Sequence, residues 1–242
     1  MELTDQWVVG FVDGDGCFRV YKQKSDNNRY IFVVSQDKRS IHVLYALKTK
    51  FGCGSVHSAG GGGQMYEYKV TNQNHLINYI IPFFFKNPLQ TVKNNDFIKL
   101  AEALTNTQFT ERKVTPLTRD WLVGFIDAEG CFYVSMVENY PRPQLKIGLH
   151  IRDKDIIERI QAFIEFGVIY HSKTKPVIHY QISSKDGMKS IIKICTTGAN
   201  RCLLKTTKRI DFLKFKQIVR IISEKKHLTP KGILTINKIL KK

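Results

Sequence analysis

Hydrophobic and polar positions along this chain change from helix-like to strand-like spacing in an order that runs twice. Two apolar stretches open these runs: residues 7–16 read WVVGFVDGDG, and residues 121–130 read WLVGFIDAEG, 114 positions later. A Leu-Thr pair stands shortly before each stretch, and Cys-Phe follows each one. The chain of 242 residues is therefore predicted to be a tandem duplication, with one copy of the stretch opening each half.

Each stretch has the boundaries of a helix. Thr4 and Thr118 suit the N-cap position. Gly16 and Gly130 are expected to end the two helices in the left-handed conformation. Small residues recur four apart, at Gly10 and Gly14 and at Gly124 and Ala128. Because this spacing lets two backbones approach closely, the two helices are predicted to pack against each other.

The remainder of the first half alternates between strands and helices. The pattern predicts strands at 18–24 and 29–36, a helix at 37–51, a hairpin of 53–57 and 65–71, and helices at 74–85 and 89–104. Polar residues 105–116, which end in Pro116, read as a linker.

The second half follows the same order. It predicts a strand at 131–139, a turn at 140–143, a strand at 144–151, a helix at 153–166 ending at Gly167, a hairpin within 168–183, and helices at 185–195, 206–223 and 229–240. The last helix has no counterpart in the first half. The predicted fold is α+β: a pseudo-symmetric tandem of αββαββα repeats, 1–104 and 117–242, each with one curved four-stranded antiparallel sheet.

Acidic residues close both apolar stretches. Asp15 and Glu129 directly precede the terminal glycines, where the negative end of the helix dipole disfavours a carboxylate by roughly 0.3–1 kcal/mol. A divalent cation would offset this cost, and oxygen-only ligation suits Mg²⁺. Asp13 and Asp127 point to a different helix face, so we interpret them as structural residues that bond to backbone at the helix end.

The two stretches resemble the motif of the LAGLIDADG homing endonucleases, in the single-chain form that carries both motifs. VVGFVDGDG and LVGFIDAEG match that motif at nearly every position, half a chain apart and each with its acid. The resemblance implies motif helices at the interface between the halves and two sheets that form a saddle over duplex DNA. It also implies a monomer that hydrolyses both strands of a long, non-palindromic target, with water as the nucleophile.

The resemblance implies an active site as well. Asp15 and Glu129 would bind Mg²⁺, with the backbone carbonyls of Gly14 and Ala128 as further ligands; Ca²⁺ would permit binding without cleavage. Basic and polar residues would surround the metals. Candidates for that role are Gln36, Arg152 as its repeat equivalent through Asp37 and Asp153, and Lys93 and Lys208, with Lys205 as a competitor.

Strand alternation assigns a second task to the faces of the two sheets. Phe18, Val20, Phe132, Val134 and Met136 would cover the helices behind. The opposite faces would read base edges in a major groove, or they would simply be solvated. The predicted DNA-binding residues are Arg19, Tyr21, Gln23, Arg29, His57, Glu67 and Lys69 in the first half, and Tyr133, Ser135, Lys146, His150, Ser172, Lys173, His179 and Gln181 in the second.

Charge supports a polyanionic partner. The chain carries a net charge of +17, of which residues 1–116 supply +4 and residues 117–242 supply +13. It has 27 Lys against 11 Arg, and 26 Ile, which indicates an AT-rich gene such as those of organelles and an organellar location. No signal or transit peptide is visible, neither apolar stretch has the length of a membrane span, and the five cysteines predict neither disulfides nor zinc.

Two other functions are compatible with these features. The basic surface would also suit an RNA-binding maturase that helps its host intron to splice. A DNA-binding protein that has lost cleavage is the third possibility. The presence of both acids favours the nuclease over this inactive protein, but it does not exclude a nuclease that is also a maturase.

Overall fold

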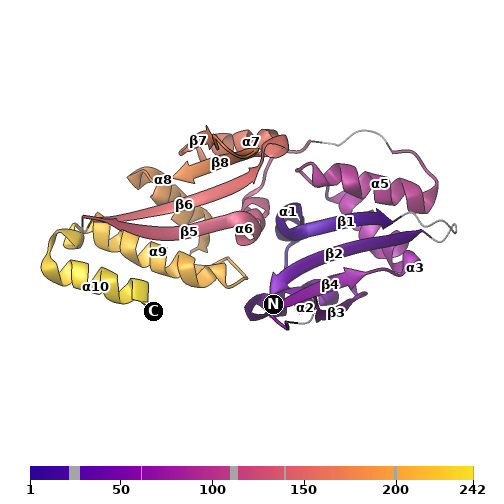
Figure 1. The fold of residues 1–242 in the computed structure, drawn as a ribbon, viewed down its shortest axis with the longest axis horizontal. Coiled ribbons are helices and arrows are strands. Elements are labelled where there is room, and N and C mark those ends of the chain that lie inside the picture. The colour runs from indigo at the N-terminus through magenta and orange to yellow at the C-terminus, as the bar shows by residue number, and fades with distance from the viewer. Residues whose placement is uncertain (22–27, 61, 110–113, 139, 199–200, 242) are drawn as a thin grey trace. The chain divides into compact units, whose positions relative to one another are not determined.

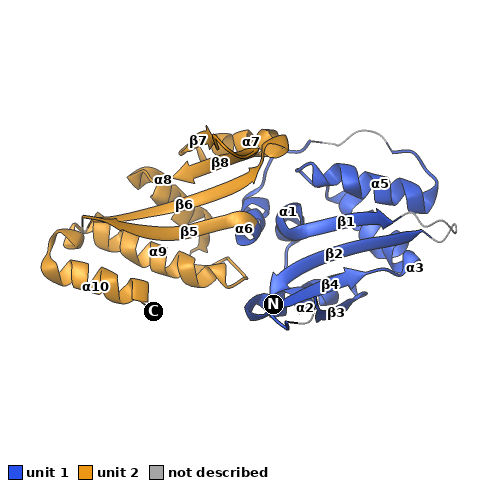
Figure 2. Cartoon of the chain, viewed as in Figure 1, with its two compact units in different colours: residues 1–128 blue, residues 129–242 orange. Residues whose placement is uncertain are grey.

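The structure is a computed structural model that describes residues 1–21, 28–60, 62–109, 114–138, 140–198 and 201–241 (Figure 1). Its contacts divide the chain into two compact units, residues 1–128 and 129–242 (Figure 2). This division differs from the predicted repeats 1–104 and 117–242, which describe sequence similarity and remain a prediction.

Unit 1 contains a four-stranded antiparallel sheet whose strands lie in the order β1-β2-β4-β3. These strands are β1 (Gly16–Tyr21), β2 (Arg29–Asp37), β3 (Ser55–Ser58) and β4 (Met65–Val70). The helices of this unit are α1 (Asp5–Asp15), α2 (Ile41–Phe51), α3 (Gln73–His75), α4 (Ile81–Lys86), α5 (Lys93–Thr105) and most of α6 (Arg119–Glu129). Aromatic rings join sheet to helices: Phe18 of β1 stacks on Phe32 of β2 and meets Phe84 of α4 and Phe97 of α5 edge-on.

Unit 2 contains a second sheet of the same form, in the order β5-β6-β8-β7. Its strands are β5 (Gly130–Val137), β6 (Tyr140–His150), β7 (Val168–His171) and β8 (Val177–Ile182), and its helices are α7 (Lys154–Ile164), α8 (Lys185–Ile194), α9 (Lys208–Ser223) and α10 (Pro230–Lys241). Phe132 of β5 packs against Phe212 and Phe215 of α9. The predicted α+β tandem of two αββαββα repeats is confirmed, and α10 is the extra helix at its end.

Helices α1 and α6 begin and pack as their sequences predict. The backbone amides of Trp7 and Trp121 donate to the hydroxyls of Thr4 and Thr118 over 3.2 and 3.1 Å, so both threonines are N-caps. A Cβ atom at Gly10 would overlap the carbonyl of Trp121. The reciprocal overlap, between Gly124 and the carbonyl of Trp7, shows that the two backbones approach too closely for any side chain at these positions.

The conformation predicted for Gly16 is wrong. Gly16 has φ −79° and ψ 158°, which is extended backbone, and it opens β1 without any left-handed residue. Gly130 opens β5 in the same way and does not have a positive φ. A Cβ at Gly16 would lie 2.7 Å from the carbonyl oxygen of Val12, so this glycine is required by close packing.

The turn predicted at residues 140–143 is also wrong, because β6 includes them. Pro141 and Pro143 pair with Met136 and Val134 of β5. Prolines donate no backbone hydrogen bond and normally occupy sheet edges. They fit here because β8 pairs with β6 only from Leu145 onward, so this end of β6 has an open side.

The helix end predicted at Gly167 is wrong. Helix α7 ends at Ile164 with Glu165 in the left-handed conformation, φ 66°, just as α2 ends at Phe51 with Gly52 at φ 67°. Gly167, at φ 97°, instead matches Gly54, at φ 78°. A Cβ at Gly54 or Gly167 would lie 2.7 Å from the ring of Tyr68 or Tyr180 respectively. The offset between the repeats is therefore 113 here, one less than between the two motif stretches.

Several helices and one hairpin differ in detail from the predicted elements. The helix predicted at 74–85 is α3, a π-helical segment at Leu76–Ile80 and α4, and the helix predicted at 89–104 is α5. Short 3₁₀ helices at Lys38–Ser40, Ile151–Asp153 and Lys226–Leu228 and a hairpin of β9 (Thr196–Thr197) and β10 (Arg201–Cys202) were not predicted. Within the described ranges, every helix is too short or too polar to cross a membrane.

Candidate active site and sheet surfaces

The carboxylate of Asp15 lies at the end of α1, half-buried beside the sheet of unit 1. Gln36, near the end of β2, donates from Nε2 to Oδ2 of Asp15 over 2.5 Å. Gln36 shares its face of β2 with Phe32 and Val34, so it points toward the helices and not toward the exposed face of the sheet. The predicted partner of the acid is thus in hydrogen-bonding contact with it.

A second predicted residue reaches the same helix end. Lys93, the first residue of α5, donates from Nζ to the backbone carbonyl of Gly14. Its backbone amide donates to the hydroxyl of Thr91 over 3.4 Å. The structure therefore brings Gly14, Asp15, Gln36 and Lys93 together, from three elements that are distant in sequence.

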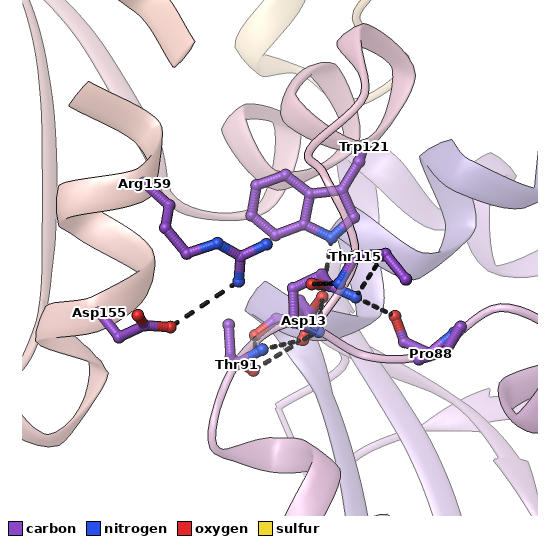
Figure 3. A network of polar contacts seen from close by, with 8 residues as sticks. Asp13, Pro88, Thr91, Thr115, Trp121, Asp155 and Arg159 are labelled. Atoms are coloured by element: carbon purple, nitrogen blue, oxygen red, sulfur yellow. Dashed lines mark hydrogen bonds and ion pairs between the residues drawn. The ribbon is translucent and has the colours of Figure 1, made fainter. Parts of the chain in front are cut away.

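Asp13 connects the start of α5 to the end of α1 (Figure 3). Its buried carboxylate accepts from the backbone amides of Gln90 and Thr91 at 2.9–3.0 Å, and from the Thr91 hydroxyl at 2.7 Å. It also accepts from Nε1 of Trp121 in α6 over 2.8 Å. Burial raises the pKa of Asp13, and these donors partly oppose that shift. The interpretation of Asp13 as a structural residue that bonds to backbone agrees with this network.

The end of α1 carries oxygen donors of the kind that bind magnesium. The carboxylate of Asp15 and the carbonyl of Gly14 are hard oxygen donors, and an ammonium group already contacts the carbonyl. Groups of three or more His, Cys, Asp or Glu side chains that could hold a metal do not occur among the described residues. Mg²⁺ commonly binds through one or two carboxylates together with substrate phosphates and water, so the residues present fit it.

The corresponding residues of the second repeat are Glu129 and Lys208. Glu129 is the last residue of α6 and is half-buried. Lys208 opens α9, and its backbone amide donates to the hydroxyl of Thr206 over 3.2 Å, as Lys93 does to Thr91. This shared geometry makes Lys93 and Lys208 equivalent; Lys205 then corresponds to Gln90.

The equivalence of Gln36 and Arg152 is wrong. Asp37 caps one short 3₁₀ helix by accepting from the amide of Arg39, and His150 caps the other by accepting from the amide of Arg152. Arg152 therefore corresponds to Arg39, and Leu149 corresponds to Gln36. The side chain of Arg152 is exposed, with Nε 3.7 Å from Oδ2 of Asp153. A catalytic role for Arg152 remains a prediction that now lacks the support of symmetry.

The exposed face of the first sheet carries the predicted polar residues. Strand pairing places Arg19, Tyr21, Arg29, His57, Glu67 and Lys69 on the face opposite the phenylalanine cluster. Arg19 donates to the Tyr21 hydroxyl over 3.2 Å, and Nζ of Lys69 lies 2.8 Å from Glu67. Ile31 and Val33 share this face and are nonetheless buried. Gln23 lies outside the described residues.

The exposed face of the second sheet carries the predicted Tyr133, Ser135, Lys146, His150, His179 and Gln181. Ser172 and Lys173 follow β7 in the connection to β8. Burial and the nearby charge of Lys146 lower the pKa of His179. Gln144 and Tyr170 share this face and were not predicted from the sequence. The period-2 alternation would have indicated Gln144, two positions before Lys146, but Tyr170 required knowledge of the strand pairing.

Comparisons with known proteins find one matching family and several relatives. The family model described as LAGLIDADG endonuclease matches residues 8–104 and 122–219. A probable intron-encoded endonuclease, Cox1-I1b of Schizosaccharomyces pombe, is 26% identical over 91% of this chain and 69% of its own length. Probable intron-encoded endonuclease 4 of Neurospora crassa is 24% identical over 96% of this chain and 43% of its own length.

One further relative and one solved structure bear on function and fold. The intron-encoded RNA maturase bI4 of Saccharomyces cerevisiae is 28% identical over 71% of this chain and 26% of its own length. The structure of I-SmaMI bound to uncleaved DNA target in the presence of calcium ions matches with a TM-score of 0.82, at 23% identity, over 98% of each chain. With two family matches that cover most of its length, this chain belongs to the LAGLIDADG endonuclease family.

Proposed function

We propose that this chain is a homing endonuclease that hydrolyses both strands of a long, non-palindromic DNA duplex with Mg²⁺. Membership of the LAGLIDADG endonuclease family supports the class of reaction, which is hydrolysis of phosphodiester bonds. In this chain, the proposal is supported by two contacts at the end of α1. Gln36 contacts Asp15, and Lys93 contacts Gly14. A helix end that attracts both an amide donor and an ammonium group has the electrostatic character of a cation site.

Asp15 and Glu129 would hold the metal, with the carbonyls of Gly14 and Ala128 as further oxygen ligands. Mg²⁺, when bound, polarises the scissile phosphate and stabilises the leaving 3′ oxygen. Gln36 orients the Asp15 carboxylate by donating from Nε2 to its Oδ2 atom. Lys93 offers a positive charge where negative charge develops on the phosphate. Lys208 and Arg152 would serve the second repeat.

The partner would be double-stranded DNA lying against the polar faces of the sheets, bound by a monomer. The greater positive charge of residues 117–242 would supply more of the non-specific attraction to phosphates. The two faces present different side chains, so the two halves of the target would differ in sequence. Relatives described as intron-encoded support an origin in an organellar intron for this chain.

The proposal is tested by cleavage of a randomised duplex library, first with Mg²⁺ and then with Ca²⁺. Enrichment of one long site that is cut with Mg²⁺ and only bound with Ca²⁺ would support it. Asp15→Asn should abolish cutting of that site and keep its affinity, because the amide no longer offers a charged ligand. Asp5→Asn is the matched control, since Asp5 opens the same helix and pairs with Lys50 outside the site. Normal cutting by Asp15→Asn would refute the metal assignment.

An RNA maturase is the second candidate function. It is favoured by the similarity to the maturase of Saccharomyces cerevisiae over 71% of this chain. The test is splicing of the host intron with and without the protein. Equal splicing in both conditions would exclude this function. Binding of DNA without cutting in either metal ion would favour this function or a DNA-binding protein that has lost cleavage.

A further inference from the structure

Two tyrosine–glutamine pairs lie on the exposed face of the second sheet. The hydroxyl of Tyr133 in β5 donates to Oε1 of Gln144 in β6 over 2.6 Å. The hydroxyl of Tyr170 in β7 donates to Oε1 of Gln181 in β8 over 3.2 Å. Each pair joins neighbouring strands, and strand pairing places all four residues on the face that carries Lys146 and His179.

The two tyrosines act on the amides in the same way. A glutamine amide offers one acceptor oxygen and two N–H donors. When it reads adenine, it uses both groups, with the oxygen accepting from N6 and the nitrogen donating to N7. A tyrosine hydroxyl that donates to this oxygen takes one of its lone pairs and holds the oxygen toward the tyrosine. We therefore expect the N–H groups to be the part of the amide that meets a base, so that the glutamine acts as a donor.

The surroundings of Tyr170 hold this arrangement in place. Nζ of Lys146 lies over the Tyr170 ring, 5.3 Å from its centroid, and the His179 ring packs against the same tyrosine with centroids 5.0 Å apart. Gly148 lies directly opposite His179 in the strand pairing, and a Cβ there would come 2.9 Å from Nδ1 of that histidine. The missing side chain at position 148 thus makes room for the histidine that supports Tyr170.

Lys146 and Gln181 are direct neighbours across β6 and β8. Lysine offers only donors, and Gln181 oriented by Tyr170 is expected to act through its N–H donors. Two adjacent acceptors occur in the major groove on guanine, at O6 and N7, whereas adenine combines an acceptor with a donor. This part of the sheet therefore matches guanine and opposes adenine.

Unit 1 lacks this device at the equivalent positions. The counterparts of Tyr133 and Gln144 are Arg19 and Ile31, which strand pairing also places opposite each other. The counterpart of Gln181 is Lys69, which pairs with Glu67 at 2.8 Å. The tyrosine–glutamine pairs are therefore specific to the second repeat.

We propose that Tyr133 and Tyr170 are positioning residues for DNA specificity: they fix Gln144 and Gln181 as donors, so that the half-site read by the second sheet prefers guanine over adenine at two base pairs. This inference rests on the proposed function, because it needs DNA on this face. The second sheet would select guanine, and the hydroxyl groups of Tyr133 and Tyr170 would maintain that preference.

The test is selection of randomised duplexes by binding in Ca²⁺, with the full chain and its variants. The wild-type chain should enrich a site with two guanine-preferring positions in one half. Tyr133→Phe should relax one of them and Tyr170→Phe the other, with the adenine-to-guanine ratio rising roughly ten-fold at that position. Tyr45→Phe is the matched control, since this exposed tyrosine belongs to helix α2 and not to a sheet, and it should leave the site unchanged.

A second variant tests the amide itself. Gln181→Glu replaces donors by acceptors, and it should exchange guanine for cytosine or adenine at the position that Tyr170→Phe relaxes. Site preferences of both phenylalanine variants that equal the wild-type preferences, or a Gln181→Glu variant that keeps guanine, would overturn the inference. A wild-type chain that enriches no duplex would instead overturn the proposed function, and this inference with it.

Discussion

The amide of Gln36 donates to the carboxylate of Asp15 over 2.5 Å, although the two residues are 21 positions apart and belong to a strand and a helix. This contact requires β2 to run back along β1 in one register, so that its end meets the end of α1. The orientation of the acid is therefore set by strand pairing and not by the helix that carries the acid.

Replacement of Gln36 by Leu should slow cleavage and spare DNA binding. Residues that orient a metal-binding carboxylate typically contribute about 10–100-fold to activity, and we expect a loss of this size. Single-turnover cleavage at saturating protein, with affinity measured in Ca²⁺, separates the two effects. Gln73→Leu, on the exposed start of α3, is the control. A cleavage rate equal to that of the wild type would show that Gln36 does not position the acid.

Replacement of Lys93 by Met should lower the cleavage rate by roughly 100-fold, because a charge aimed at developing negative charge is lost. Lys99→Met removes the same charge from the same helix, at an exposed position 3.9 Å from Asp96, and should have little effect. Comparison of the two variants in the same single-turnover assay separates the effect of the position of the charge from the effect of net charge. Equal losses in both variants would mean that Lys93 acts only through general attraction to DNA.

Alanine at Gly10 or Gly124 should destabilise the protein by about 3 kcal/mol or more, since the new methyl would overlap a backbone carbonyl that cannot move aside. Gly62→Ala places its methyl in open space and should change the free energy of unfolding by less than about 0.5 kcal/mol. Urea unfolding of the three variants measures the difference. Near-wild-type stability of Gly10→Ala would contradict the close approach of α1 and α6.

Asp13→Asn should lower stability and change its pH dependence. Asparagine keeps one acceptor oxygen and brings an NH₂ group against the backbone and indole donors that now face the carboxylate, at a cost of about 2–3 kcal/mol. Burial raises the pKa of native Asp13 above its ordinary value of 3.8. The stability that Asp13 contributes is therefore fully present below pH 3.8 and declines as the pH rises through the native pKa.

The measurement is urea unfolding of the wild type and Asp13→Asn at pH values from about 4 upward. The stability advantage of the wild type should shrink as the pH rises, because asparagine does not titrate. Asp96→Asn, at an exposed position of α5, controls for the loss of a charge. An advantage that grows with rising pH would mean that the donors around Asp13 outweigh its burial.

Local features of the chain were predictable because their causes are local. The N-caps Thr4 and Thr118, the apolar stretches and the strand alternation each depend on residues within a few positions of one another. Such signals gave the two repeats, the order of their elements and the face on which most polar residues lie. The acids and Lys93 were predicted from the family motif, and the structure places Asp15 and Lys93 at one helix end.

Predictions failed where the backbone conformation or the pairing of strands decides which atoms meet. Gly16 was predicted to be a left-handed cap, whereas the nearby Val12 is what excludes a side chain there. Arg152 was aligned with Gln36 because an Asp follows both, but the capping contacts shift the correspondence by three residues. Tyr170 was missed because only pairing with β8 brings its hydroxyl to Gln181.

The sequence by itself determined the duplication, the α+β order of elements, the acids that end both motif helices and the excess of positive charge. Each of these features depends on composition or on the spacing of residues close together in the chain. Only the tertiary structure decided which groups contact those acids and how the amides on the sheet are oriented. The physical reason is that a hydrogen bond requires a donor and an acceptor within about 3 Å of each other. Whether two groups come that close depends on strand register and helix packing, to which interactions along the whole chain contribute.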